Sequence, residues 1–396
     1  MQCGRPLLLR QPFSPDTFDQ VILGCVNVIA DEMNPARVAA LRLGMGEKMV
    51  AFTVQINCGS GMQSIDTAYR YIREGVSDLI LAGGTESLSH APLVFSRSAV
   101  EWYAGMFGAR NVWARLGALA KFRPSMLKPV IGLERGLTDP VVELNMGQTA
   151  ELVSHLFRIS RAQADQYAVE SQLRTARAQK EGWFAGEMEP AMARNGTLFD
   201  HDDGVRSDSS VENLAKLKPA FERPWGKVTA GNSSQITDGA SWVVLASEDA
   251  VKKHNLKPRA VILDSEWSAL DPSIMGLGPV LCSTAIMRRH NMKLGDVDLW
   301  ELNEAFAAQV LGCLAAWEDD EFCREVLGLE GAAGRIDRTK FNVDGGAIGM
   351  GHPVGASGNR IVLHLVNAMK RLGSKRGIAT ECIGGGQGGA MLIEAI

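Results

Sequence analysis

One cysteine stands at a corner of the predicted fold where a thiol could act as a nucleophile. Cys58 lies in QINCGSGMQS, between an apolar, strand-like run and a helical pattern. Backbone N–H groups and the helix dipole at such a corner favour a thiolate and can bind an oxyanion. Gly59 and Gly61 allow tight backbone geometry and the close approach of a substrate. A buried structural cysteine is the alternative, because that is the commoner role of a lone cysteine.

A thiol nucleophile needs a base, and His352 is the candidate. Six of the seven histidines have ordinary surroundings, whereas His352 lies in DGGAIGMGHPVGASG, among glycines and ahead of a helical pattern. A surface loop histidine is the alternative, but it would not need so much backbone freedom around it.

Two further polar side chains follow predicted strands. Cys382, in TECIGGGQGG, could serve as an acid or base beside N–H groups that form an anion hole, or it could be an inert core thiol. Asn303, in LWELNEAFAAQV, could cap the following helix or orient a water that donates to a substrate oxygen. We expect Cys58, Cys382 and His352 to meet at the mouth of one cleft.

The elements that must position these residues occur twice. VAFTVQI and DLILAGG indicate buried strands, and SGMQSIDTAYRYIREG between them indicates a helix, which together predict a parallel β-α-β unit. KFNVDGG, GASGNRIVLHLVNAMKRLG, GIATECIGGG and GAMLIEAI repeat this scheme near the C-terminus. We therefore predict a duplicated α/β domain.

The segment between the two halves has a different composition. Residues 89–205 carry 14 of the 37 Trp, Phe and Met residues and an amphipathic helix with Ser160 as its N-cap. The predicted division is a first domain over 1–88, an inserted loop domain over 89–205, the closing part of the first domain over 206–248, and a second domain over 249–396.

Composition limits the class of protein. The chain has 396 residues, 46% of them apolar and 22% charged, so it is globular with two or three packed units. A net charge of −4 gives no reason to expect nucleic acid as a partner. Seven scattered cysteines without CxxC pairs argue against a disulfide framework or a zinc site and predict a reducing compartment, the cytoplasm. The sequence has no run of eighteen apolar residues, so it predicts no membrane span.

Taken together, four segments resemble the thiolase family. NCGSGMQS, NEAFAAQ, GGAIGMGHPVGASG and CIGGGQG occur in the order found in that family, and the resemblance extends from about Asp19 to the C-terminus. It implies a duplicated, five-layered α-β-α-β-α fold with an inserted loop domain, usually assembled into homodimers or homotetramers.

The resemblance also implies a role for each candidate residue. Cys58 would take the acyl group, and His352 would activate Cys58 and later the incoming CoA thiol. Cys382 would move a proton to or from the acetyl α-carbon. Asn303 would hold a water that, with His352, stabilises the thioester enolate, while the N–H groups of Cys58 and Gly384 would form a second oxyanion hole.

Two contacts with coenzyme A follow from the same resemblance. Ser234, in AGNSS, would contact the pantetheine, and Arg206, in DDGVR, would lie near the phosphate end of CoA. Coenzyme A is a substrate here, and the chemistry needs no metal or redox cofactor.

Within the family, the resemblance favours a 3-ketoacyl-CoA thiolase of fatty-acid β-oxidation. RSDSSVENLAKLKPAFERPWGKVTAGNSS is similar to the β-subunit of fatty-acid oxidation complexes. An acetoacetyl-CoA thiolase of short-chain or biosynthetic type is the nearest alternative. A ketoacyl-synthase-type condensing enzyme would not be expected to carry the second thiol, Cys382. A non-catalytic, thiolase-like lipid-binding protein would be expected to lose reactive residues that are all retained here.

Residues 103–133 suggest a contact with another surface. They hold five basic residues, no acidic one and an apolar stripe at Val112, Leu116, Leu119 and Phe122. Such a segment could meet a membrane or the α-subunit of a fatty-acid oxidation complex, or it could dock on its own protein.

The beginning of the chain departs from the family pattern. Only MQCGRPLLLRQPFSPDTFDQ precedes VILGCVN, so the first strand and part of the first helix are expected to be missing. A parallel sheet without that strand has unpaired backbone groups unless another segment replaces it.

Overall fold

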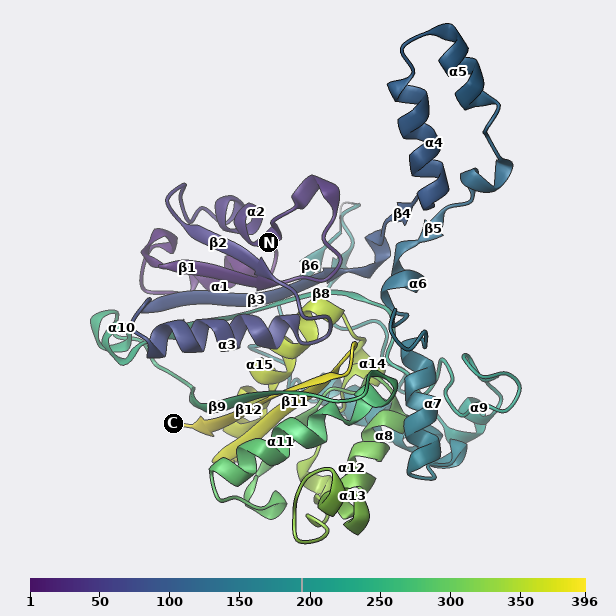
Figure 1. The fold of residues 1–396 in the computed structure, drawn as a ribbon. Helices are drawn as coiled ribbons and strands as arrows, with labels where there is room; N and C mark the ends of the chain where they lie inside the picture. Colours follow the sequence, from purple (N-terminus) through teal and green to yellow (C-terminus); the bar gives the residue numbers. More distant parts are fainter. Residues whose placement is uncertain (194) are drawn as a thin grey trace.

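The structure, a computed structural model, describes residues 1–193 and 195–396. Two mixed sheets lie one above the other, with helices between them and on their outer faces (Figure 1). Helix, sheet, helix, sheet and helix therefore follow one another as five layers. The α/β, five-layered fold expected from the sequence is confirmed.

The first sheet has the strand order β2-β1-β3-β8. β1 is parallel to both β2 and β3, and β8 runs antiparallel to β3. Its central strands are apolar and almost fully buried because helices cover both faces. The strands are β1 (Gln20–Gly24), β2 (Val50–Val54), β3 (Leu79–Ser87) and β8 (Asp238–Ala246).

The second sheet has the strand order β10-β11-β12-β9. β10 is parallel to β11, while β12 is antiparallel to both β11 and β9. The strands are β9 (Ala260–Ala269), β10 (Leu299–Leu302), β11 (Arg376–Ile383) and β12 (Gln387–Ala395).

The two sheets repeat one topology. β1, β3 and β8 pair with one another as β10, β11 and β12 do, with two parallel strands followed by an antiparallel one. The halves differ at both edges. β2 flanks β1, whereas no strand of the described residues flanks β10 on its outer side. At the other edge β9 flanks β12, whereas no strand of the described residues lies on the outer side of β8. The first strand that the sequence analysis expects to be missing would lie at this edge, beside β8. The thiol of Cys3 lies 3.7 Å from the carbonyl oxygen of Ala240 there.

Two long helices fill the space between the sheets. α3 (Ser60–Arg73) follows β2, and α15 (Val354–Leu372) occupies the matching place in the second half (Figure 1). They pack side by side in one apolar cluster that includes Met62, Ile65, Ile361 and Leu365. Their first turns approach closely, since a Cβ on Gly61 would lie only 2.7 Å from the amide nitrogen of Asn359.

The remaining helices cover the outer faces. α8 begins as the sequence predicts, because the Ser160 hydroxyl accepts a hydrogen bond from Gln163 N. Although α7 and α8 come from the segment predicted as an insertion, they pack in the core of the second half. The first sheet is covered by α1 (Gly4–Leu9) and α2 (Pro35–Arg42), and the second by α7 (Met146–Leu156), α8 (Arg161–Lys180), α11 (Gly278–Arg289), α12 (Ala307–Glu318) and α13 (Asp320–Glu325).

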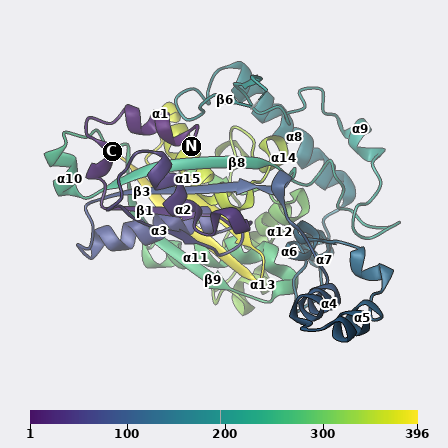
Figure 2. The ribbon, with the colours of Figure 1, turned by 90° about the horizontal axis from the view of Figure 1, so that it is seen from above.

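Part of the inserted segment forms an arm that projects from the body of the molecule (Figures 1 and 2). The stem is a two-stranded ribbon and the tip is a helical pair, joined to the body through α6. The elements of the arm are β4 (Leu93–Val94), α4 (Arg97–Gly108), α5 (Val112–Leu119), β5 (Val130–Ile131) and α6 (Gly132–Gly136).

Short elements complete the chain: β6 (Ala191–Met192), β7 (Leu198–Phe199), α9 (Val211–Ala215), α10 (Glu248–Lys253) and α14 (Ala347–Met350). Among residues 1–193 and 195–396, every helix is too short or too polar to span a membrane.

Candidate active site

Cys58 lies at the corner between β2 and α3. The hydroxyl of Ser60 stabilises this corner, since it accepts from Ile56 N at 2.9 Å and donates to Asn57 O at 2.7 Å. Asn57 itself has a φ of 46°, which turns the chain sharply before the cysteine. Cys58 remains partly exposed, while its sulfur lies deep among protein atoms.

Gly59 shows why no side chain is possible next to Cys58. A Cβ at this position would lie 2.5 Å from Cδ1 of Ile383, at the end of β11. The corner of the first half is therefore in direct contact with the end of a strand from the second half.

The glycine loop after β11 completes this contact. Asn57 Nδ2 donates to the carbonyl oxygen of Gly384 at 2.7 Å. The backbone N–H groups of Gly384 and of Cys58 lie on the side of the Cys58 sulfur, where they act to lower the pKa of its thiol. Gly385 and Gly386 have φ values of 93° and 78°, which residues with a side chain rarely adopt. Two amide donors thus converge at the predicted nucleophile.

Cys382 lies near the end of β11, just before this loop, and is fully buried. It packs with Met275 and Ala305, and with the partly buried Met146 and Phe306. Burial raises the pKa of its thiol well above the usual value, and the nearby Cys58 thiol raises it further. Cys382 is thus a neutral thiol whose close electrostatic neighbour is Cys58.

His352 lies in the loop between α14 and α15, where Gly351 has a φ of 91°. Its Nδ1 lies 2.6 Å from the Ser357 hydroxyl, which itself donates to Pro353 O at 3.2 Å. Because that hydroxyl already donates, it accepts the proton of Nδ1, and Nε2 is the unprotonated nitrogen. Nε2 is buried and has no hydrogen-bond partner among the described residues. It is therefore free to accept a proton.

The surroundings of His352 keep the imidazole neutral. Burial lowers its pKa to about 4, and the positive charge of Arg360 acts in the same direction. A neutral imidazole with a free Nε2 is the form that a general base requires.

Asn303 follows β10 and does not cap a helix. α12 begins at Ala307 with Phe306 as its N-cap residue and without a side-chain capping hydrogen bond. Both amide atoms of the Asn303 side chain are buried without a partner among the described residues. Buried polar groups almost always have a partner, so an amide in this state points to a bound water or ligand. The capping alternative considered from the sequence is wrong.

Ser234 and Arg206 lie at different depths. Ser234 N donates to Ala305 O at 3.0 Å, and the next residue, Gln235, accepts from His352 N at 3.0 Å. Ser234 thus lies between the Asn303 loop and the His352 loop. Arg206 is exposed on a surface loop, where its backbone N–H donates to Gln172 Oε1 at 2.8 Å. The structure brings Ser234, but not Arg206, against the loops that carry the other site residues.

One expectation about Cys58 is wrong. The sequence predicts a corner that favours a thiolate, but burial and the charge of Glu381 raise the pKa of Cys58 to about 12. The two amide donors oppose this shift without overcoming it. Desolvation of a thiolate outweighs the helix N-terminus here, so the resting nucleophile is a thiol.

Three residues of the site were not found from the sequence. Ser357 fixes the tautomer of His352, and Asn57 and Ser60 hold the Cys58 corner. Asn57 bonds to Gly384, which only the tertiary fold brings near, whereas Ser60 and Ser357 bond to residues within five positions of themselves. The only signal in the sequence that could have indicated them is their position, because each lies one to five residues from a candidate catalytic residue.

The matches to known proteins cover both halves of the chain. The family description "Thiolase, N-terminal domain" matches residues 2–249, and "Thiolase, C-terminal domain" matches residues 256–395. The chain belongs to the thiolase family. The predicted family, fold and enzyme class are thereby confirmed.

Several characterised thiolases are similar over nearly the full chain. A β-ketoadipyl-CoA thiolase of Pseudomonas aeruginosa is 40% identical over 382 residues, which cover 96% of this chain and 88% of that protein. The human mitochondrial 3-ketoacyl-CoA thiolase is 38% identical over 390 residues, with the same shares covered.

Solved thiolase structures superpose closely. The crystal structure of human mitochondrial 3-ketoacyl-CoA thiolase has a TM-score of 0.83 at 38% identity, covering 99% of this chain and 91% of that one. The Bacillus anthracis acetyl-CoA acetyltransferase has a TM-score of 0.84 at 34% identity, covering 100% and 92%.

Proposed function

We propose that this thiolase cleaves a 3-ketoacyl-CoA with CoA, giving acetyl-CoA and an acyl-CoA shortened by two carbons, through an acyl-Cys58 intermediate. The observation that carries the proposal is the meeting of the Cys58 corner with the Gly384 loop, where two N–H groups converge on the thiol. His352, with a free Nε2, and Cys382 supply the proton transfers that the reaction needs.

In the first half-reaction, Cys58 attacks the C3 ketone while its proton passes to His352 Nε2. The alkoxide that forms is bound by the N–H groups of Cys58 and Gly384, each worth roughly 3–4 kcal/mol when well placed. The C2–C3 bond then breaks, which leaves the acyl group on Cys58 and the electron pair on the enolate of acetyl-CoA. Cys382 donates a proton to the enolate carbon, and acetyl-CoA leaves.

The enolate needs a second site for its negative charge. The unpartnered amide of Asn303 is suited to hold a water that donates to the enolate oxygen together with His352. Separate sites for the alkoxide and the enolate allow each charge to be stabilised where it develops.

Before the second half-reaction, the proton that His352 took from Cys58 returns to the Cys382 thiolate. The thiol of CoA then loses its proton to His352 Nε2 and attacks the acyl-Cys58 carbonyl. The tetrahedral intermediate collapses to acyl-CoA, the departing Cys58 sulfur takes the proton back from His352, and ping-pong kinetics follow. Ser234, next to these loops, would contact the pantetheine, and the exposed Arg206 would meet the phosphate end of CoA. The reaction as written takes up no electrons from outside and releases none, and protein N–H groups, water and His352 stabilise its charges, so we propose no metal or redox cofactor.

For the substrate we propose longer-chain 3-ketoacyl-CoA in fatty-acid β-oxidation, with acetoacetyl-CoA as the alternative. The similar proteins include a β-ketoadipyl-CoA thiolase, 3-ketoacyl-CoA thiolases and an acetyl-CoA acetyltransferase, and a 3-ketoacyl-CoA thiolase is among the most similar. Thiolysis of acetoacetyl-CoA and of 3-ketohexadecanoyl-CoA, compared at saturating CoA, tests the choice. A kcat/KM at least tenfold higher for the long substrate supports the proposal, and the reverse ratio supports the alternative.

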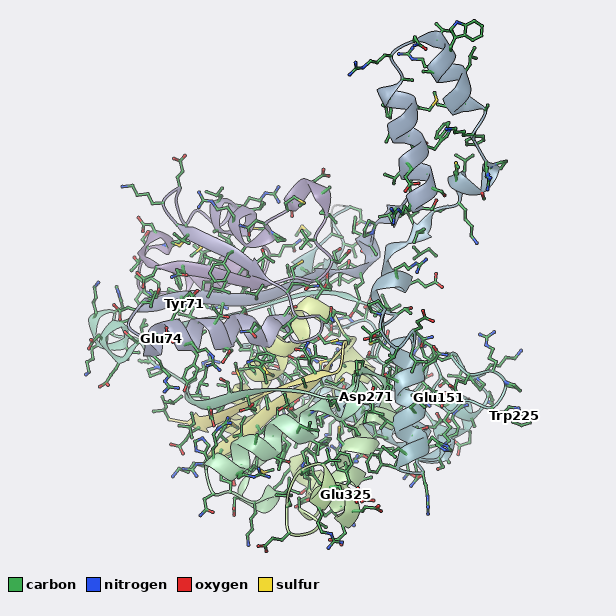
Figure 3. All side chains as sticks on the ribbon, viewed as in Figure 1. Tyr71, Glu74, Glu151, Trp225, Asp271 and Glu325 are labelled. Atoms are coloured by element: carbon green, nitrogen blue, oxygen red, sulfur yellow. The ribbon has the colours of Figure 1, made fainter. Side chains whose placement is uncertain are left out.

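We further propose that the arm is a contact surface. Phe107 and Trp113 are 86% and 82% exposed, although large aromatic side chains usually lie inside a protein. Figure 3 shows the side chains of α4 and α5 pointing into open space, with no other part of the chain beside the tip. Together with five basic residues, this surface suits a second copy in a homodimer or homotetramer, a partner subunit or an anionic membrane surface.

The location that we propose is the cytoplasm. All seven cysteines are free in the structure, and two of them must stay reduced for the proposed reaction. A reducing compartment meets this requirement.

The residue roles are tested by Cys58→Ala, His352→Asn and Cys382→Ser. Each variant should lose at least a thousandfold in thiolysis while keeping the wild-type circular dichroism. Normal thiolysis in Cys58→Ala would refute the acyl-cysteine mechanism.

A further inference from the structure

Glu304 has a buried carboxyl group that accepts hydrogen bonds on both of its oxygens. Oε1 accepts from the Tyr167 hydroxyl at 2.7 Å and from Asn342 Nδ2 at 3.1 Å. Oε2 accepts from the Ser171 hydroxyl at 2.6 Å and from Ile348 N at 3.2 Å. Glu304 is only 1% exposed, so bulk water does not compete for these bonds. The proposed mechanism does not use this group.

The four donors come from separate parts of the chain. Two hydroxyls come from adjacent turns of α8, one N–H comes from α14, and the fourth donor is Asn342, in the segment that leads into α14. The donor in α14, Ile348, lies four residues before His352. Glu304 itself follows Asn303, just after β10. One side chain therefore joins the Asn303 loop to α8 and to the loop that carries His352.

A glycine makes room for this carboxyl group. A Cβ on Gly346 would lie 2.6 Å from Cδ of Glu304 and 2.7 Å from its Oε2. Gly346 directly precedes α14. The His352 loop thus packs on the carboxyl group with no space for a side chain between them.

The side chain of Asn303 depends on the neighbouring backbone for its orientation. Both of its amide atoms are buried without a hydrogen-bond partner among the described residues. The backbone N–H of Asn303 donates to Thr380 O at 2.9 Å. On the preceding side, the N–H and C=O groups of Leu302 bond to the side chain of Asn342 at 2.8 and 2.9 Å. On the following side, the bonds of Glu304 hold the chain.

His352 has supports that do not involve Glu304. Its backbone N–H donates to Gln235 O at 3.0 Å. Its Nδ1 lies 2.6 Å from the Ser357 hydroxyl. Loss of the Glu304 carboxyl group would therefore displace Asn303 more than His352.

We propose that Glu304 is a positioning residue that holds the Asn303 amide where one water can bridge it and His352 Nε2 to the enolate oxygen. The inference rests on the proposed function, in which that water stabilises the enolate. The enolate forms only when the C2–C3 bond breaks. Attack of Cys58 on a thioester uses instead the N–H groups of Cys58 and Gly384. Glu304 is therefore required for carbon–carbon cleavage and not for acyl transfer.

Two reactions of the same enzyme separate these roles. Thiolysis of whichever 3-ketoacyl-CoA the wild type prefers, at saturating CoA, requires the enolate site. Acetylation of Cys58 by acetyl-CoA, measured by rapid acid quench and mass spectrometry, breaks no carbon–carbon bond. In this reaction the acetyl group moves to the Cys58 sulfur, and the Cys58 proton passes through His352 to the departing CoA thiolate. General damage to the fold lowers both rates alike, whereas a displaced Asn303 lowers only the first.

Glu304→Gln should lower kcat for thiolysis at least thirtyfold and change the acetylation rate less than threefold. The N–H groups of Asn342 and Ile348 can only donate, and they bond to different oxygens of Glu304. A glutamine amide accepts at one atom only, so one of these donors would face an NH2 group.

Ser171→Ala is a milder variant, which keeps the carboxyl group and removes one of its donors. It should lower kcat for thiolysis about three- to tenfold and leave the acetylation rate within threefold of the wild type. This variant decides the question if Glu304→Gln does not fold.

Glu151→Gln is the matched control. The carboxyl group of Glu151 is also buried and accepts from the backbone N–H groups of Lys227 and Val228 at 2.8–2.9 Å. These bonds join α7 to residues 227–228 instead of joining the Asn303 and His352 loops. The variant should unfold more easily in urea but keep the ratio of the two rates within threefold of the wild type.

Equal losses in both reactions for Glu304→Gln, or an unchanged ratio in both Glu304→Gln and Ser171→Ala, would overturn the inference. A change of the ratio in Glu151→Gln as large as that in Glu304→Gln would also overturn it. If the wild type performs thiolysis without acetylating Cys58, the proposed function fails instead.

Discussion

Single residues determine the chemistry of this site through burial more than through charge. The Cys58 sulfur has two amide donors, and yet burial raises its pKa to about 12. His352 is affected in the opposite direction, because burial disfavours its cationic form. Both shifts keep the resting pair neutral. The Cys58 thiol and the His352 imidazole are therefore both uncharged in the absence of substrate.

The depressed pKa of His352 predicts a specific loss of stability in acid. The unfolded chain binds a proton near pH 6.5, whereas the folded chain does so only near pH 4. The stabilisation is thus complete above pH 6.5 and is lost as the pH falls toward 4, by about 2 kcal/mol between pH 6.5 and pH 5. Urea unfolding at these pH values should show this loss in the wild type and a smaller one in His352→Gln. Equal losses in the two proteins would contradict the neutral, buried imidazole.

The pH dependence of activity should follow from the same residue. Because His352 is neutral at pH 5.5, kcat/KM should fall on the acid side only near pH 4 to 5 and not through pH 6.5. Initial rates of thiolysis between pH 4.5 and 8 measure this limb, with a short incubation to avoid unfolding. An acid limb centred at pH 6.5 would show that the imidazole is exposed.

At the scale of elements, two duplicated units bring the catalytic loops together. The Cys58 corner and the Cys382 loop come from different halves, and they meet because α3 and α15 pack with their first turns in contact. Small residues make this approach possible, as the Gly61 contact with the backbone of α15 illustrates. The distance between nucleophile and base is therefore set by helix packing.

Gly61→Ala tests that dependence. The new Cβ would lie 2.7 Å from Asn359 N and 3.1 Å from the carbonyl oxygens of Gly355 and Ala356, all of them backbone atoms that cannot rotate away. We expect a loss of about 1–3 kcal/mol in the free energy of unfolding. A displacement of α15 should also lower kcat at least tenfold, measured by thiolysis at saturating substrate.

Gly117→Ala, within α5 of the arm, is the matched control. A Cβ there meets nothing within 4 Å, and the backbone is helical. This change should leave kcat unaltered and be neutral or slightly stabilising. Wild-type activity and stability in Gly61→Ala would show that the helix contact does not set the site geometry.

The sequence predicted the elements around the site because their patterns are local. The runs before Cys58 and Cys382 are strands, and the helical pattern after Cys58 is α3. Only the strand before Cys382 is buried; β2 was expected to be buried but is half-exposed, because it lies at the edge of its sheet. Hydrophobic periodicity and glycine positions carry this information. The raised pKa of Cys58 was not predictable, since it depends on Glu381 and on atoms far away in the sequence.

For the whole molecule, the principal asymmetry is the arm. The two halves repeat a topology and form one body, while residues 93–131 extend away from it (Figure 2). Composition indicated an insertion over 89–205, but it did not distinguish the arm from α7 and α8, which pack in the core of the second half. That distinction depends on which apolar faces find a partner after folding. The stripe on α5 stays exposed, apart from the contact of Phe122 with Trp102 of α4 within the arm.

Deletion of residues 105–127 should therefore leave the body intact. These residues make few contacts outside the arm, so thermal unfolding and the proposed thiolysis should change little. Co-sedimentation with anionic vesicles and light scattering of the protein alone should show loss of vesicle binding or of oligomers. If both stay unchanged, the arm is not a contact surface.

The acyl-enzyme itself provides the most direct test of the account. Acetyl-CoA added to the wild type, followed by acid quench and mass spectrometry, should add one acetyl group to the peptide that carries Cys58. Under the same conditions His352→Asn should label at least a hundredfold more slowly, and added CoA should remove the label from the wild type. An acetyl group on a different residue, or its absence from a folded enzyme that is active in thiolysis, would contradict Cys58 as the nucleophile.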